Sequence, residues 1–304
     1  MRGERVMKFA LFHCCVNAMG LDQYLSSTGA VLGELGIAFI HLKDFNCCGY
    51  PLRNFNFKAF LLASARNLAI AEKEALPILT VCNCCFGNLK YAEQYLRIDA
   101  ARREEVNAAL AREGLHYKVG ASTNHILQVL HDGIGLQRLR PKLKKTFRGL
   151  KIATHYGCHI LRPSKITQFD SPFTPTKFDR LVALTGAEPI SWLSKLECCG
   201  SPVTGINDDL SMDLAEKKLM NAKEAGADYL CVACPFCQLQ FDRVQSAMIN
   251  RRGSKVLMPS IVYTQLLGLS LGLDPQSLGM EMNVLPITGI QQFLSENSPK
   301  QGSC

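Results

Sequence analysis

The feature that most constrains the fold of this chain is a pattern of five cysteines that occurs twice. Each copy has a lone cysteine, then an adjacent pair followed by glycine, then two cysteines separated by two residues. The two sets are Cys15, Cys47, Cys48, Cys82 and Cys85, and Cys158, Cys198, Cys199, Cys234 and Cys237. A period of roughly 145 to 150 residues indicates a duplicated domain, because solenoid repeats are much shorter.

The spacing within each set favours an iron–sulfur cluster over zinc. Adjacent cysteines present neighbouring sulfurs, which suit two metal ions of one cluster better than a single tetrahedral ion. Zinc is the main alternative, but a zinc site takes four ligands, and its two Cys-x2-Cys pairs usually lie within about 20 residues of each other. Here each set has five cysteines, and the Cys-x2-Cys pairs lie far apart. The dense cysteine run of ferredoxins is also absent, so we expect an unusual cluster.

Composition indicates a globular protein of a reducing compartment. The chain has 304 residues and 47% apolar content, enough for two ordinary domains, whereas disulfide-rich secreted proteins are usually small. We therefore expect its fourteen cysteines to act mainly as thiolate metal ligands, with structural or disulfide cysteines as the alternative. The apolar run at residues 9–12 is too short for a secretory signal, which predicts a cytoplasmic protein.

Two other segments have simple interpretations. The longest apolar stretch, residues 256–273, is interrupted by Pro259 and polar residues, so we expect a buried or partner-facing helix and no membrane span. The basic run at residues 138–151 contains no acidic residue, and the whole chain carries a net charge of +8. We expect this run to be a solvated linker, or a surface that attracts an anionic substrate or an acidic partner. Because no nucleic-acid-binding motif accompanies it, we do not expect the protein to bind nucleic acid.

Apolar segments alternate with helical patterns in both halves, which predicts an α/β fold. We expect two pseudo-symmetric domains, each with a small parallel sheet flanked by helices. The predicted domains are residues 1–145 and 146–275, followed by a C-terminal tail at 276–304. The expected strands are residues 7–12, 37–42, 78–81, 151–155, 189–192 and 228–232, and the expected helices are 21–35, 57–74, 178–185 and 208–225. Because parallel strands end on one edge of the sheet, cysteines distant in sequence can meet there.

From residue 7 to about residue 273 the chain resembles the B subunit of heterodisulfide reductase and its relatives, including the sulfur-oxidising heterodisulfide reductase-like complexes. The resemblance rests on the two Cys-Cys-Gly motifs and on several further stretches. These are Thr80-Val81-Cys82-Asn83, His155-Tyr156-Gly157-Cys158-His159, Cys234-Pro235-Phe236-Cys237, Leu239-Gln240-Phe241-Asp242 and Thr264-Gln265-Leu266-Leu267-Gly268-Leu269.

The resemblance implies two noncubane [4Fe-4S] clusters, each held by one five-cysteine set, with a substrate disulfide cleaved between them. It implies an enzyme, an oxidoreductase acting on sulfur groups, that cleaves or forms a disulfide or oxidises a sulfur-bearing thiol. The residues expected at the reacting sulfurs are Cys48, Cys199, His155 and His159. The two histidines would donate to sulfur or deliver protons, with purely structural hydrogen bonding as the alternative. Gly49 and Gly200 would let backbone N–H groups approach the thiolates.

Partners and alternatives follow from the same resemblance. No Gly-x-Gly-x-x-Gly follows a strand, so electrons would come from a ferredoxin-like C subunit together with a flavoprotein A subunit of the same complex. The substrate would be a small thiol or disulfide, free or carried on a protein. One alternative is a non-catalytic electron-transfer or anchoring subunit of a hydroxy-acid or succinate/fumarate oxidoreductase complex. Another is a zinc-stabilised interaction module.

Three cysteines depart from the family pattern. Cys14 and Cys84 stand where relatives often have glycine, and Cys231 is an additional cysteine before Cys234. We expect these three to be non-ligands, with replacement of a ligand as the alternative. Cys304 is expected to be incidental.

Overall fold

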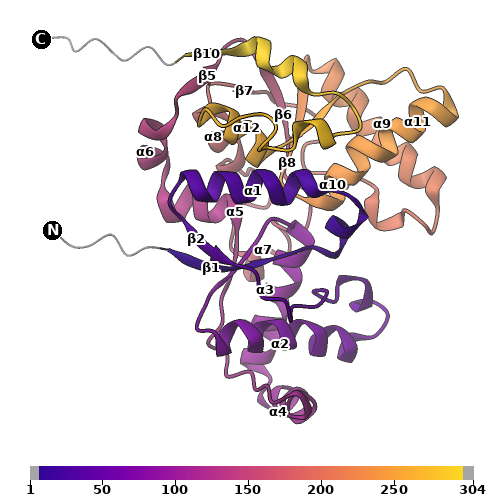
Figure 1. Cartoon of the computed structure of the whole chain (residues 1–304). Helices are drawn as coiled ribbons and strands as arrows, with labels where there is room; N and C mark the ends of the chain where they lie inside the picture. Colours follow the sequence, from indigo (N-terminus) through magenta and orange to yellow (C-terminus); the bar gives the residue numbers. More distant parts are fainter. Residues whose placement is uncertain (1–6, 297–304) are drawn as a thin grey trace, which may run out of the picture.

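The computed structural model describes residues 7–296 and contains two four-stranded parallel sheets of the same topology (Figure 1). The first sheet has the order β2-β1-β3-β4, and the second has the order β7-β6-β8-β9. The strands of the first sheet are β1 (Lys8–Phe12), β2 (Ala38–Ile40), β3 (Ile78–Thr80) and β4 (Thr123–His125). Those of the second are β6 (Lys151–His155), β7 (Glu188–Pro189), β8 (Tyr229–Val232) and β9 (Ser260–Val262). The predicted α/β fold with a repeated parallel sheet is confirmed.

Helices connect the strands of both sheets. In the first half they are α1 (Asp22–Glu34), α2 (Phe57–Lys73), α3 (Asn83–Ile98), α4 (Ala100–Leu110), α5 (Ile126–Gln128) and α6 (Leu136–Leu139). In the second half they are α7 (Ser164–Thr167), α8 (Lys177–Leu184), α9 (Asp208–Glu224), α10 (Pro235–Leu239), α11 (Gln245–Arg252) and α12 (Tyr263–Ser270). Helices α2 and α9 are equivalent, and each has 17 residues. Each begins after an asparagine whose Oδ1 accepts a backbone N–H at 3.0 Å, Asn56 in one case and Asn207 in the other.

The two halves are packed together through contacts between their helices. Helix α1 of the first half packs against α12 of the second, and α8 of the second half contacts α5 of the first (Figure 1). Between α1 and α12, the hydroxyl oxygens of Ser27 and Thr264 lie 2.6 Å apart in a buried hydrogen bond. The hydrophobic core around these helices draws residues from both halves, including Leu32 and Leu266. Helices of the two halves therefore share one hydrophobic core.

The segment after residue 275 folds back onto the rest of the chain. Leu278, Met280 and Ile290 are buried. The strand β10 (Leu294–Glu296) pairs antiparallel with β5 (Lys145–Phe147), which crosses the predicted boundary between the two domains. The domain boundaries themselves stay a prediction, and Cys304 lies outside the described residues.

The apolar stretch at residues 256–273 differs from the helix expected there. Residues 260–262 form strand β9, and α12 begins only at Tyr263. The β-branched pair Ile261-Val262 after Pro259 favours an extended backbone, and β8 lies beside it to accept the pairing. Every residue of α12 is buried, so this helix belongs to the core. In the part of the chain that the structure describes, no helix is both long enough and apolar enough to cross a membrane.

Candidate metal centre

The predicted ligands lie at the carboxyl ends of equivalent strands, as expected. Cys15 follows β1, Cys47 and Cys48 follow β2, and Cys82 follows β3 and precedes α3. The second set occupies the equivalent positions: Cys158 follows β6, Cys198 and Cys199 follow β7, and Cys234 and Cys237 follow β8. The two sets meet in space, because the Sγ atoms of Cys82 and Cys234 are only 3.9 Å apart. This one contact joins residues 152 positions apart in the chain.

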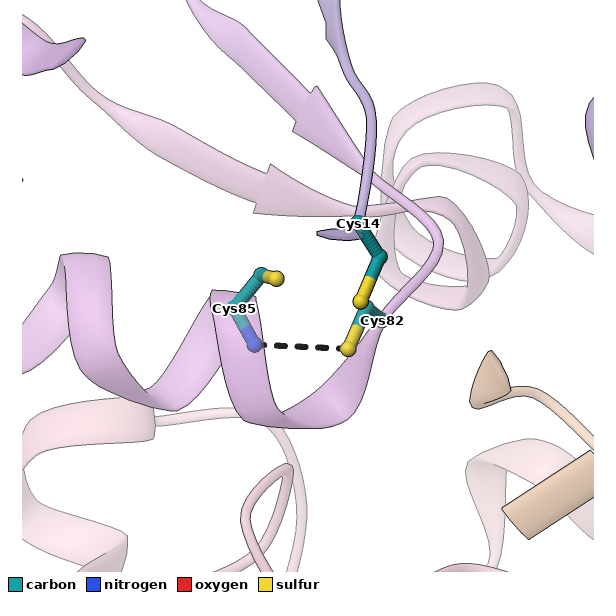
Figure 2. Close-up of side chains that lie close together, drawn as sticks. All are labelled: Cys14, Cys82 and Cys85. Carbon is teal, nitrogen blue, oxygen red and sulfur yellow. Dashed lines mark hydrogen bonds between the residues drawn. The ribbon is translucent and has the colours of Figure 1, made fainter. Parts of the chain in front are cut away.

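Sulfur atoms are close together within each set. The Sγ atoms of Cys15 and Cys47 are 3.8 Å apart, and those of Cys199 and Cys237 are 3.7 Å apart. Three compact groups of ligand atoms lie within the interior: Cys14, Cys82 and Cys85; Cys82, Cys84 and Cys234; and His155, Cys199 and Cys237. Figure 2 shows the first group, in which the backbone N–H of Cys85 on α3 points at the Cys82 Sγ, 3.5 Å from the nitrogen.

The donor set fits an iron–sulfur group. Every cysteine in the described part of the chain is a free thiol, and soft sulfur donors are the ligands that iron–sulfur clusters take. Each set combines buried thiols with two at the rim: Cys15 and Cys198 are exposed, and Cys47 and Cys158 are half-buried. The residues that would hold the two clusters are the ten cysteines predicted from the sequence, and that assignment stays a prediction.

The extra cysteines are placed differently from one another. Cys14 and Cys84 are buried and lie inside the compact sulfur groups, next to predicted ligands. Cys231 lies within β8, is fully buried, and belongs to none of these groups. Burial raises its pKa, so this thiol stays protonated. Sequence spacing alone could not place Cys14 and Cys84, since both are neighbours of a ligand along the chain.

The adjacent pairs are held by their glycines in the same way in both halves. Gly49 and Gly200 have φ angles of 83° and 88°, which a residue with a side chain rarely adopts. The Gly200 N–H donates to the Cys198 Sγ at 3.4 Å. Hydrogen bonding with the Cys158 thiol, then with Cys199 and this N–H, lowers the pKa of Cys198. The pKa of Cys47 is lowered through the equivalent thiols and Gly49, so the first cysteine of each pair is the readier thiolate.

The two predicted histidines occupy different environments. His155, the last residue of β6, is buried, and its Nε2 lies 3.2 Å from the Cys237 Sγ. Burial and the Lys218 ammonium hold its pKa well below the usual range, so this ring is neutral and suited to orienting a sulfur. His159 lies in the loop after β6, with Nδ1 3.1 Å from the Cys158 Sγ and 3.6 Å from the Cys84 Sγ.

A cavity of about 700 Å³ leads from the surface to these residues. Its walls include Tyr50, His159 and Phe236, which also border a narrow throat. The cysteines that line this throat are Cys84, Cys158, Cys199, Cys234 and Cys237. Of the two cysteines expected at the reacting sulfurs, Cys199 therefore borders the throat. Cys48 is instead contacted by the Asn88 amide at 3.8 Å and is not among the described residues that line it.

Sequence reasoning missed two cations of the cavity wall. Arg53 and Arg162 both line the cavity, and no acidic side chain is among the described residues that line it. The Arg53 guanidinium stacks 4.2 Å over the Tyr91 ring and donates to Asn88 Oδ1 at 3.2 Å. No local motif marks either arginine, because the cavity forms only when loops from both halves meet. The basic run at residues 138–151 lies elsewhere, from the end of α6 through β5 to the start of β6.

Comparison with known proteins agrees with the duplicated site. The family model described as "Cysteine-rich domain" (CCG) matches twice, at residues 9–90 and 152–242. A hypothetical protein from Helicobacter pylori of known crystal structure has the same fold, with a TM-score of 0.76 at 17% identity. That alignment covers 94% of this chain but only 53% of the other, so the chain spans about half of that protein's length.

Two relatives with named functions match over nearly their whole length. The B subunit of the ferredoxin/F(420)H(2)-dependent CoB-CoM heterodisulfide reductase of Methanosarcina acetivorans is 35% identical, covering 91% of this chain and 94% of the relative. The membrane anchor subunit of the 8-methylmenaquinol:fumarate reductase of Wolinella succinogenes is 32% identical, covering 92% and 98%. With two matches to the family model and this extent of identity, the chain belongs to the family of heterodisulfide reductase B subunits, built from two cysteine-rich domains.

Proposed function

We propose that this protein is the catalytic iron–sulfur subunit of a heterodisulfide reductase-like complex. It would cleave or form a disulfide, or oxidise a sulfur-bearing thiol, between two noncubane [4Fe-4S] clusters. The observation that carries the proposal is the meeting of the two cysteine sets at the Cys82–Cys234 contact, beside a cavity open to the surface. A non-catalytic electron carrier has no need of a substrate-sized cavity that ends at the sulfurs.

The cavity residues suit a sulfur-bearing molecule with an anionic part. The aromatic rings of Tyr50 and Phe236 would hold the apolar body of the substrate, and Arg53 and Arg162 would attract negative charge. When bound, the two clusters would supply the two electrons that breaking a disulfide requires. His159 borders both the cavity and the throat, and it would hand a proton to a departing thiolate.

His155 would have a supporting role. It is buried behind the Cys237 Sγ, and its ring packs edge-on against Phe241 with the centroids 5.1 Å apart. A neutral ring held in this position can orient a ligand sulfur but has no open path to solvent. We therefore assign proton delivery to His159 and sulfur positioning to His155.

The first experiment is to measure iron, sulfide and zinc in anaerobically purified protein and to record EPR spectra before and after adding a thiol. Two clusters correspond to about eight iron atoms per chain. A paramagnetic signal induced by the thiol is the expected result for a catalytic subunit. Zinc near stoichiometric amounts with little iron would rule out the proposal and leave a structural module.

The second candidate is an electron-transfer or anchoring subunit of a fumarate reductase-type complex. It is favoured by the similarity to the Wolinella succinogenes anchor subunit, which extends over 92% of this chain. The same EPR experiment separates the two functions. Clusters that accept electrons but give no response to any thiol or disulfide would favour this candidate.

The proposed setting is a cytoplasmic complex, because free thiols persist in reducing compartments. The proposed partners are a ferredoxin-like C subunit together with a flavoprotein A subunit, which would exchange electrons with this chain. Relatives of this chain are subunits of heterodisulfide reductases, which supports a setting with several different chains.

A further inference from the structure

The two halves differ at one equivalent position beside their cysteine pairs. Helices α2 and α9 have the same length and the same asparagine cap, so their residues correspond one to one. At the same position in the helix, α2 carries Asn67 and α9 carries Lys218. Asn67 is fully buried, and Lys218 is only 1% exposed.

Both side chains make the same contact with the loop that carries the cysteine pair. The Asn67 Nδ2 donates to the carbonyl oxygen of Asn46 at 3.1 Å, one residue before Cys47. The Lys218 Nζ donates to the carbonyl oxygen of Glu197 at 3.1 Å, one residue before Cys198. The anchoring role is therefore shared, and the difference between the two halves is a buried positive charge.

The charge of Lys218 is not neutralised nearby. Its Nζ also donates to the Ser194 carbonyl oxygen and lies 4.8 Å from the centre of the Trp192 ring. Among the described residues, no carboxylate lies within ion-pair distance of this ammonium; the Glu197 carboxylate pairs instead with the exposed Lys217. A buried and unpaired ammonium acts through a medium of low dielectric constant, so its field on neighbouring sulfur is strong.

Cations near the first set are better screened. Arg66 contacts the loop before Cys47 but is ion-paired with Glu113 at 2.7 Å and is partly exposed. Arg53 borders the open cavity, where water and ions weaken its field. The two cysteine sets, alike in spacing, therefore sit in unequal electrostatic environments.

We infer that Lys218 raises the reduction potential at the second cysteine set and makes it the more readily reduced of the two centres. Reduction adds one electron, and therefore one negative charge, which the buried ammonium stabilises at the second set and the neutral Asn67 does not at the first. This inference rests on the proposed function, since it requires a redox centre at both sets. The difference in reduction potential sets a direction for electron transfer between the two centres, because the centre at the second cysteine set is reduced first.

The test is a redox titration with dithionite, followed by EPR, on anaerobic protein with Lys218→Asn. This change gives α9 the asparagine that α2 has at the same position, and it retains a hydrogen-bond donor for the Glu197 carbonyl oxygen. The higher of the two midpoint potentials should fall by at least a tenfold change in the reduction constant, about 59 mV for one electron. Lys218→Arg should restore it, and Asn67→Lys should raise the lower midpoint. The matched control is Lys217→Asn, which removes the same charge from an exposed neighbour and should move neither midpoint.

Iron and sulfide are measured on every variant, so that the possible failures can be told apart. Unmodified protein without clusters would overturn the proposed function and this inference together. If Lys218→Asn keeps its iron and both midpoints stay where they were, only the inference fails. If Lys218→Asn loses iron, the inference is tested with two other variants, the neutral Lys218→Met and the reciprocal Asn67→Lys. Unchanged midpoint potentials in both of these variants would overturn the inference. A shift in Lys217→Asn as large as that in Lys218→Asn would also overturn it.

Discussion

At the scale of single residues, Gly49 and Gly200 fix each cysteine pair against the helix that follows it. A Cβ atom on Gly200 would lie 2.6 Å from the Ser211 carbonyl oxygen, and one on Gly49 would lie 3.1 Å from the equivalent Phe60 oxygen. Both contacts are with backbone, which cannot move aside as a side chain can. Glycine is therefore required at both positions for two reasons: its backbone can adopt the positive φ angle, and a Cβ atom would clash with the helix backbone.

We expect Gly200→Ala to lower the free energy of unfolding by about 2 kcal/mol or more, the sum of backbone strain and the clash with Ser211. Gly205→Ala is a control with a similar φ angle, 82°, and no atom within 4 Å of the new Cβ. Urea unfolding of both variants measures the difference. An equal loss of unfolding free energy in the two variants would mean that backbone strain alone, without the clash, accounts for the requirement for glycine at position 200.

The positions of the ten cysteines after equivalent strands were predictable from residues alone, but their surroundings were not. The spacing of the cysteines repeats, and parallel strands end on one edge of a sheet; their role as ligands stays a prediction. Cys84 and Arg53 were not placed, since each acquires its neighbours from the other half or from a distant helix. A side chain that borders a cavity between two loops has no signature in its own segment.

At the scale of elements, the central strands and the edge strand β2 were predictable, whereas the edge strands β4 and β9 were not. Strands β1 and β6 are buried except for their first residue, and both were expected within one residue of where they lie. Strand β4 is Thr-Asn-His, which has no apolar alternation, and it forms because β3 presents free backbone groups beside it. Strand β9 was hidden inside an apolar stretch expected to be helical. The fourth strand of each sheet is thus set by its neighbour more than by its own sequence.

His125 joins β4 to α5 and provides a pH-dependent test of that junction. Its Nδ1 accepts the Leu127 N–H at 3.2 Å, and burial lowers its pKa to about 3. The unfolded chain binds a proton at this residue below about pH 6.5, whereas the folded chain does not until about pH 3. Stability supplied by the neutral ring is therefore complete above pH 6.5 and is lost progressively as the pH falls towards 3.

His125→Asn keeps an acceptor for the Leu127 N–H and removes the titration. Between pH 7.5 and pH 5, wild-type protein should lose about 2 kcal/mol more unfolding free energy than this variant. Chemical denaturation at the two pH values gives the comparison. His116→Gln supplies a control, because it removes an imidazole that is exposed in the folded chain. If His125→Asn loses as much unfolding free energy as wild type between the two pH values, then His125 is not held neutral in the folded chain.

At the scale of the whole molecule, the two halves share buried cores, so we expect them to unfold as one cooperative unit. Leu68 on α2 of the first half and Trp192 of the second belong to the same buried cluster. Trp192 is the only tryptophan in the chain, so its fluorescence reports on the second half.

Leu68→Ala should therefore lower the unfolding midpoint seen by Trp192 fluorescence and by far-UV circular dichroism equally, at a cost of about 2 to 5 kcal/mol. The control is Ile98→Ala, at a position 73% exposed, which should leave both midpoints in place. A fluorescence midpoint that does not move, with a biphasic dichroism curve, would mean that the halves unfold separately.

The packing of α1 on α12 also sets an order of events during synthesis. Ser27 and Thr264, which meet at this contact, are 237 residues apart in the chain. At a translation rate of 5 to 20 residues per second, roughly 12 to 47 seconds separate their emergence from the ribosome. During that interval the part of α1 that packs on α12 has no final partner. The first half of this protein therefore completes its fold only when nearly the whole chain has been made.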